Sequence, residues 1–143
     1  MIKKISEQNF KKYGCLIGYP RRPKRPRKNL FRVLLREPQR FGWRIAYLVV
    51  REKAIKRLEQ HLHTYESFEP VKGRALLYLS LTKDKRRIEC FLLDRPVVLS
   101  KGVWHGVVTL DRESEIKITE NARVRSIYWN TGMILDGKGI PPK

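Results

Sequence analysis

The stretch REKAIKRLEQHLH, which runs from Arg51 to His63, decides the fold because it supports two incompatible structures. Its residues are good helix formers, and apolar side chains recur at helical spacing at Ala54, Ile55, Leu58 and Leu62. As a strand, the same stretch would line one face with polar groups, as the interior of a ligand-holding barrel allows: Arg57, Glu59, His61 and His63. The two interpretations exclude each other.

All three histidines fall in two short constellations, HLHTYE at 61–66 and GVWH at 102–105. Imidazole nitrogen and carboxylate oxygen suit zinc, manganese, iron, nickel or copper. Four ligands are available: His61, His63, Glu66 and His105. On a strand, residues 61 and 63 face the same side, whereas on a helix they lie about 200° apart and could not share one ion. The metal site therefore requires an extended segment.

Composition predicts one domain over residues 1–143, because this length and 41% hydrophobic residues allow a sizeable core. Two cysteines, Cys15 and Cys90, are too few for a disulfide framework, and no stretch resembles a secretory signal. No run approaches 18 apolar residues, which argues against a membrane-spanning helix. We therefore expect a soluble, cytoplasmic protein with reduced thiols.

The net charge of +18 is concentrated near the N-terminus. Residues 1–58 hold 18 Lys and Arg against 3 Glu, whereas residues 59–143 hold 14 basic against 11 acidic residues. The densest part, RRPKRPRK at 21–28, contains prolines that forbid helix and favour an extended path. It could neutralise nucleic-acid phosphates, but an exposed loop in a charge-rich protein of a thermophile is the favoured interpretation.

Many short strands are expected, separated by turn residues. They cover residues 31–36, 43–50, 75–82, 87–93, 97–100, 103–110, 115–119 and 124–129. Since only residues 51–62 could form a helix, the pattern favours an all-β sandwich or barrel with little helix. Trp104 and Phe68 are expected in its core.

A family resemblance favours the strand interpretation of residues 51–63. The pattern E-x-H-x4-E-x-F-x-P-x-K-G is formed by Glu59, His61, Glu66, Phe68, Pro70, Lys72 and Gly73. Together with VWH at 103–105 and the opening ISEQNFKKYG at 5–14, it resembles the ureidoglycolate lyases, formerly called hydrolases, which are cupin β-barrels. The likeness spans most of the chain at low identity.

The resemblance implies a double-stranded β-helix (jelly-roll) barrel, usually a homodimer, whose interior holds a small carboxylate. The family cleaves ureidoglycolate to glyoxylate and urea in purine catabolism, a lyase reaction that needs a base and a proton donor. Mapped onto this chain, the ligands of a divalent ion (Zn, Mn, Ni or Fe) are His61, His63, Glu66 and His105. Glu66 and His105 are also candidate catalytic residues, and Lys72 or Lys101 would pair with the substrate carboxylate.

Because the chain departs from the family pattern at several positions, metal binding is more strongly expected, and ureidoglycolate as the substrate less strongly, than in a typical member. The lyases usually have Gln at the position of Glu66 and a second His at that of Gly106, and their Asn-Tyr pair is Val98-Leu99 here. The role of Glu59 is open, since it could orient a histidine or lie opposite Arg57. Two alternatives remain: a non-catalytic cupin that binds metal or ligand, and a nucleic-acid-binding protein that uses residues 21–28.

Overall fold

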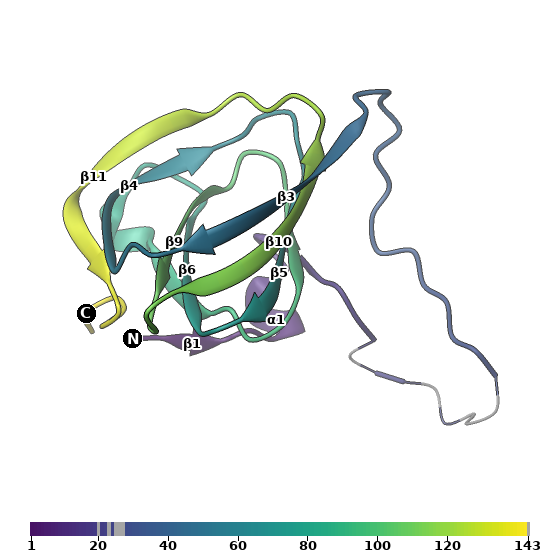
Figure 1. The fold of residues 1–143 in the computed structure, drawn as a ribbon, viewed down its shortest axis with the longest axis horizontal. Coiled ribbons are helices and arrows are strands. Elements are labelled where there is room, and N and C mark those ends of the chain that lie inside the picture. The colour runs from purple at the N-terminus through teal and green to yellow at the C-terminus, as the bar shows by residue number, and fades with distance from the viewer. Residues whose placement is uncertain (20, 23, 25–27, 143) are drawn as a thin grey trace.

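The computed structural model describes residues 1–19, 21, 22, 24 and 28–142, and its central feature is a set of eight consecutive strands (Figure 1). These strands are β3 (Trp43–Val50), β4 (Ala54–Gln60), β5 (Glu66–Lys72), β6 (Ala75–Ser80), β7 (Glu89–Leu92), β8 (Val97–Leu99), β9 (Trp104–Thr109) and β10 (Ser114–Asn121). They form two antiparallel four-stranded arrays, in the orders β3-β10-β5-β8 and β4-β9-β6-β7. This strand order is that of a jelly roll, which confirms the predicted all-β barrel with little helix.

Short flanking elements extend both arrays. Strand β1 (Lys3–Lys4) lies parallel to β7, β2 (Gly14–Leu16) pairs with β8, and β11 (Ile127–Asp136) pairs with β4. The helices are a single turn, α1 (Glu7–Phe10), and a 3-10 turn, η1 (Lys85–Arg87). Within the described residues, no helix has the length and apolar character needed to cross a membrane.

The sheet that contains β6 is buried on both faces. Leu77, Leu79 and Phe91 belong to a core cluster between the two sheets, whereas Leu76 and Tyr78, which point the other way, belong to a second cluster. Strand β11 contributes to this second cluster through Leu135 and Trp129. Both faces of β6 are therefore apolar, which explains why its sequence is a continuous apolar run.

Residues 54–60 form a strand, so the helical interpretation is wrong and the extended one is confirmed for these residues, whereas the chain leaves the strand at His61 and bends at residues 62 and 63. Leu58 is fully buried, whereas Leu62, which would share its face on a helix, is 48% exposed. Pairing with β9 on one side and β11 on the other fixes the strand, because it satisfies the backbone groups that a helix would otherwise bond internally.

The strand predicted at residues 31–36 is absent. This segment has no regular secondary structure, and Phe31 is 89% exposed (Figure 1). Its Phe, Val and Leu residues gave it strand propensity, but a strand also needs a paired neighbour, and no sheet includes it. The strand predicted at 87–93 is shorter than expected, since it begins at Glu89 after η1.

Part of the predicted basic loop at 21–28 is described and exposed, namely Arg21, Arg22, Lys24 and Lys28. The rest of it, Pro23, Arg25, Pro26 and Arg27, lies outside the described residues.

Candidate metal centre

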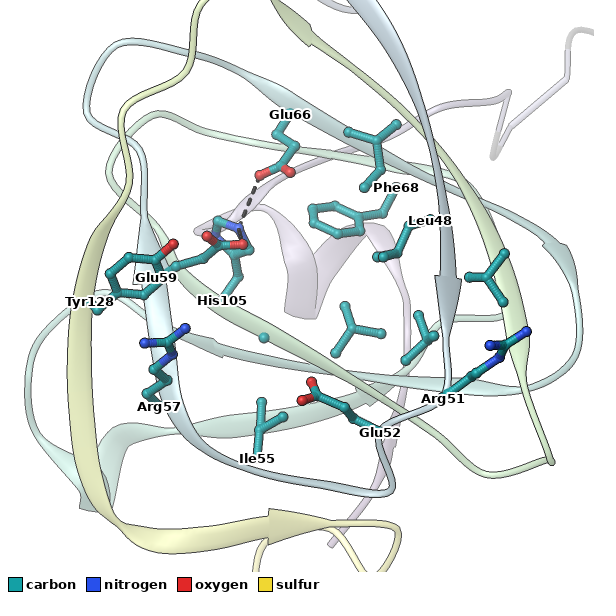
Figure 2. Close-up of a pocket in the computed structure, with 15 residues that line it drawn as sticks. Leu48, Arg51, Glu52, Ile55, Arg57, Glu59, Glu66, Phe68, His105 and Tyr128 are labelled. Atoms are coloured by element: carbon teal, nitrogen blue, oxygen red, sulfur yellow. Dashed lines mark ion pairs between the residues drawn. The ribbon is translucent and has the colours of Figure 1, made fainter.

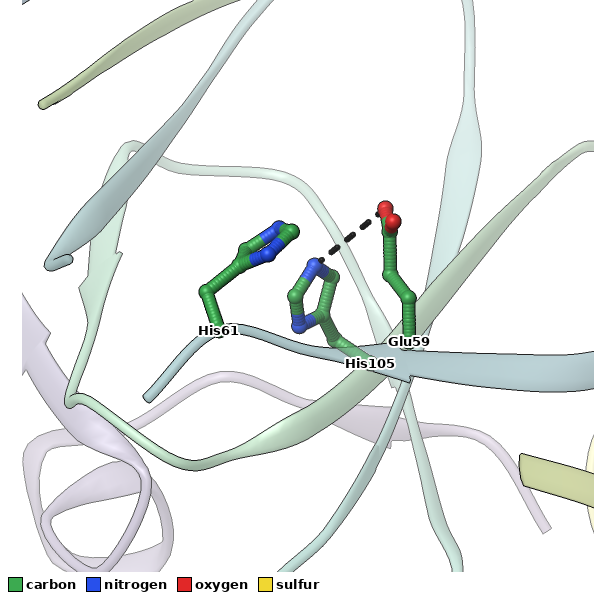
Figure 3. A group of neighbouring side chains, drawn as sticks. All are labelled: Glu59, His61 and His105. Atoms are coloured by element: carbon green, nitrogen blue, oxygen red, sulfur yellow. Dashed lines mark ion pairs between the residues drawn. The ribbon is translucent and has the colours of Figure 1, made fainter. Parts of the chain in front are cut away.

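Four polar side chains from three strands meet inside the jelly roll. Glu59 lies on β4, His61 directly follows that strand, Glu66 opens β5, and His105 lies on β9. The pairing of β4 with β9 places Glu59 opposite His105. The rings of His61 and His105 are 5.0 Å apart between centroids, although 44 positions separate them in the sequence (Figure 3). The fold thus brings together the two histidine constellations.

Both imidazoles point their Nε2 atoms at the same carboxylate oxygen. Glu66 Oε2 lies 3.3 Å from His61 Nε2 and 3.0 Å from His105 Nε2. Glu59 Oε1 lies 3.5 Å from His105 Nε2 on the other side (Figure 3). His61 and Glu66 are each 6% exposed and His105 is 3% exposed, so this convergence is largely shielded from water.

The opposite nitrogen of each ring is fixed by the backbone. His61 Nδ1 lies 3.0 Å from the carbonyl oxygen of Arg125, and His105 Nδ1 lies 3.0 Å from that of Val103. Because a carbonyl can only accept, each Nδ1 must donate its hydrogen there, which leaves the Nε2 lone pair directed at Glu66 in the neutral ring. Two acceptors that face each other at this distance need a proton or a metal ion between them.

Without a metal, protons supply that positive charge. Burial alone would lower the pKa of His105, but the charges of Glu66 and Glu59 outweigh it and raise the pKa to about 10. Burial also acts against ionisation of Glu66, yet the two histidines lower its pKa to about 2. The pKa of His61 is raised, mainly by Glu66 against the effect of burial, and the pKa of Glu59 is lowered by the neighbouring ring of His105.

The same geometry fits a divalent ion. Ligand atoms bonded to a metal at about 2.1 Å lie roughly 3.0–3.4 Å apart in tetrahedral or octahedral shells. The distances of 3.0 and 3.3 Å from Glu66 Oε2 to the two Nε2 atoms fall in this range. In addition, Glu66 Oε2 and His105 Nε2 are buried atoms with no hydrogen-bond partner among the described residues. Histidines held through Nδ1 by a carbonyl are also typical of metal sites.

Two overlapping ligand sets share His61. The first adds Glu59 and His105, and the second adds Glu66 and Glu120. Glu120 Oε2 lies 2.7 Å from Arg44 Nη2, so its charge is already compensated by an arginine. We therefore favour a centre formed by His61, Glu66 and His105, with Glu59 beside it.

The centre borders a cavity of about 520 Å³ that opens between the two sheets (Figure 2). Glu59, Glu66 and His105 are among its lining residues, and so is Arg57, two positions before Glu59 on β4. The opposite wall is apolar and includes Leu48 and Phe68 (Figure 2). A metal ion at the centre would therefore be reached from this cavity.

Three of the residues singled out in the sequence lie away from the centre. His63 is exposed, because the strand ends at Gln60 and the chain bends at residues 62 and 63 before β5. Lys72 is exposed at the end of β5. The ammonium of Lys101 pairs with Glu37 and lies 5.0 Å from the ring centre of Tyr65, and neither lysine lines the cavity.

The predicted core residues surround the centre. Trp104 is 3% exposed and packs edge-to-face on Trp129, while Phe68 is 2% exposed and packs on the ring of His105. At Gly106, a Cβ atom would lie 2.5 Å from Ile55 Cδ1 and 2.9 Å from Leu58 Cδ2. The second histidine of the ureidoglycolate lyases therefore has no room at this position unless apolar side chains move.

The sequence did not predict that Arg57 lines the cavity or that Glu120 lies beside His61 and Glu66. Arg57 was recognised as sharing a face with Glu59 and His61, and that alternation was the signal that could have placed it in the cavity. Glu120 carried no local signal, because it meets Glu66 only through the pairing of β10 with β5.

No protein-family model matches the chain, and no curated protein matches it significantly. Among solved structures it is similar to oxalate decarboxylase from Bacillus subtilis, a cupin. A point mutant and the enzyme at pH 4.6 each show 14% identity and a TM-score of 0.47, and a third structure, concerned with the enzyme's Mn(II) centres, shows 16% and 0.45. Each match covers 62% of this chain but only about a quarter of the decarboxylase. The strand order of the chain itself shows a jelly roll, whereas membership of the cupin superfamily and of the ureidoglycolate lyase family stays a prediction.

Proposed function

We propose that this protein is a metal-dependent cupin-type enzyme that acts on a small carboxylate. One observation carries the proposal: two imidazoles with their Nδ1 atoms held by backbone carbonyls aim both Nε2 atoms at one buried carboxylate oxygen beside an open cavity. His61, Glu66 and His105 would hold the ion. Three protein ligands leave coordination positions for substrate, which is the arrangement of catalytic rather than structural sites.

When bound, a divalent ion would polarise the substrate and lower the pKa of a hydroxyl group on it. Glu59 is suited to receive the proton. Its side chain is 36% exposed, compared with 8% for Glu66, and it lines the cavity. In the lyase reaction suggested by the resemblance, Glu59 would take the hydroxyl proton as the carbonyl forms. The carbon–nitrogen bond then breaks, and the departing nitrogen takes up a proton.

We expect Glu59→Gln to lower turnover about 10²- to 10⁴-fold while the metal content stays unchanged, because the variant loses a proton acceptor but keeps His61, Glu66 and His105. The measurement is glyoxylate release from ureidoglycolate by protein loaded in turn with Zn, Mn, Ni and Fe. Glu115→Gln, on β10, is the control, since this residue does not line the cavity. Absence of turnover with every metal would exclude ureidoglycolate as the substrate.

We expect metal affinity to rise with pH. The pKa of His105 in the metal-free protein is raised to about 10, so at neutral pH its ring carries a proton that the ion must displace. Since that proton is bound throughout the range, the apparent association constant should increase at least about tenfold per unit between pH 6.5 and 8.5. Competition with a chelator of known protonation constants measures this slope. An affinity that does not change with pH would mean that the ion does not bind His105.

Two further predictions from the sequence, nucleic-acid binding through residues 21–28 and assembly as a homodimer, stay predictions. The metal centre does not depend on either.

A further inference from the structure

We propose that the carboxylate bound in this cavity carries an apolar substituent of several carbons, with its acid group held by Arg57 and its substituent against the wall formed by Leu48 and Phe68. The inference rests on the proposed function for the metal centre and goes beyond it by naming the class of substrate. It differs from the resemblance, which implies a polar ureido group in the same place.

Arg57 is the cation that remains free in the cavity. Among the described residues no carboxylate lies within ion-pair distance of it, whereas Arg51, which also lines the cavity, is paired with Glu113 at 3.0 Å. The Arg57 guanidinium lies 4.2 Å from the ring centre of Tyr128, another residue that lines the cavity (Figure 2). A guanidinium held on an aromatic face keeps its edge donors for a planar, two-oxygen acceptor such as a carboxylate.

Arg57 is also placed at a useful distance from the metal centre. It precedes Glu59 by two positions on β4, so the two side chains share a face and begin about 7 Å apart. A ligand with its carboxylate on Arg57 would therefore reach Glu59 and His105 through only a few bonds. These three side chains lie along one side of the cavity in Figure 2.

The facing wall cannot satisfy a polar substituent. It is formed by aliphatic and aromatic side chains of β3, β5 and β10, namely Leu48, Val50, Phe68 and Ile118. A ureido group placed there would lose its hydrogen bonds to water without replacing them, at a cost of the order of 1–3 kcal/mol for each unpaired group. An apolar substituent would instead gain by burial.

The size of the cavity agrees with a longer acid. Its volume is about 520 Å³. An acid of six non-hydrogen atoms fills at most roughly 180 Å³ of it if each atom takes the share of a water molecule in the liquid. A second carboxylate is disfavoured at the other end, because Glu52 lines the cavity there and has no ion-pair partner among the described residues (Figure 2). The volume that a small acid would leave unfilled is therefore suited to an apolar substituent.

A series of 2-oxo acids of increasing length tests this inference on the unmodified full chain. The probes are glyoxylate, pyruvate, 2-oxobutanoate, 2-oxopentanoate and 4-methyl-2-oxopentanoate, titrated by calorimetry into protein with and without Mn(II). Since each added carbon buries about one methylene, affinity should rise about fourfold per carbon, and at least about 50-fold over the series. An affinity that stays constant or falls as the acid lengthens would overturn the inference, and this test needs no variant.

Matched variants test which residues contact the carboxylate of the ligand and which contact its apolar substituent. Arg57→Gln should weaken all five acids by a similar factor, about tenfold or more, whereas Lys56→Gln, on the opposite face of β4, should weaken none. Leu48→Ser should flatten the series without weakening glyoxylate, whereas Ile45→Ser, on the outer face of the same strand, should leave the slope intact. Equal slopes in the Leu48 and Ile45 variants would contradict the assigned wall.

The metal content of each sample separates this inference from the function on which it rests. Full Mn(II) occupancy with a flat series would overturn the apolar substituent and leave the metal centre standing. If affinity rises with the length of the acid in protein that binds no Mn(II), the metal-dependent function would be overturned, whereas the preference of the cavity for an apolar substituent would be supported.

Discussion

His61→Ala and His105→Ala should each reduce the metal content of the purified protein from about one ion per chain to nearly none. Each substitution removes one of the nitrogen ligands that converge on Glu66. We expect the metal dissociation constant to rise by more than about 100-fold, because even residues that only orient a metal-bound histidine contribute 10- to 100-fold. Elemental analysis after equilibration with Zn(II) or Mn(II) measures the content.

His63→Ala is the matched control for these variants. His63 lies two positions from His61 but is exposed and outside the centre, so its removal should leave the metal content unchanged. Because loss of either histidine leaves the buried charge of Glu66 with one imidazole partner instead of two, circular dichroism must show that the variants are folded, and His61→Gln provides a milder substitution. Equal loss of metal in the His63 and His61 variants would contradict the proposed ligand set.

Leu58→Ala should lower the free energy of unfolding by about 2–5 kcal/mol. Leu58 is fully buried in the cluster on the face of the sheet that β11 covers, and its truncation opens a cavity beneath Gly106. Urea unfolding of the metal-free protein measures the change, since metal bound only to the folded state would add to its stability.

Leu62→Ala makes this experiment a test of the strand as well as of packing. Residues 58 and 62 share a face on a helix, so a helical segment would make both truncations costly. In the structure, Leu62 lies in the bend that follows β4 and is 48% exposed, so its truncation should change stability by no more than about 0.5 kcal/mol. Similar losses in the two variants would contradict the extended structure of this segment.

The positions of most strands could be predicted because their signals are local. Apolar runs bounded by turn residues identified β3, β6 and β9, and the core position of Trp104 followed from the last of these runs, whereas β5, which carries Phe68, was not among the predicted strands. Residues 31–36 have a similar apolar composition without forming a strand. The difference is the partner strand, which lies elsewhere in the sequence and which composition cannot reveal.

The centre was predicted in outline and missed in detail. His61, Glu66 and His105 were identified from residue type, and the strand brings them together. The alternation that placed His63 beside His61 holds only within a strand, and β4 ends at Gln60. Placing His63 in the centre would need the strand to run three residues further, and sequence patterns do not fix the end of an element that closely.

The choice of Lys72 and Lys101 as partners of the substrate carboxylate shows a second limit. Both lysines were named as basic side chains that could pair with a carboxylate, but residue type does not decide which way a side chain points. Arg57 lines the cavity because it lies on the same face of β4 as Ile55 and Glu59, each two positions away. It also lacks a carboxylate partner among the described residues. A basic side chain that faces the cavity is therefore better predicted from the alternation of side chains along a strand than from its residue type alone.

Pulsed electron paramagnetic resonance of the Mn(II)-loaded protein tests the metal centre most directly, because it detects nitrogen nuclei bonded to the ion. The wild-type spectrum should show couplings from two histidine nitrogens, with one lost in His61→Gln and both kept in His63→Ala. A bound Mn(II) without nitrogen coupling, or with a coupling that depends on His63, would contradict a centre built on His61, Glu66 and His105.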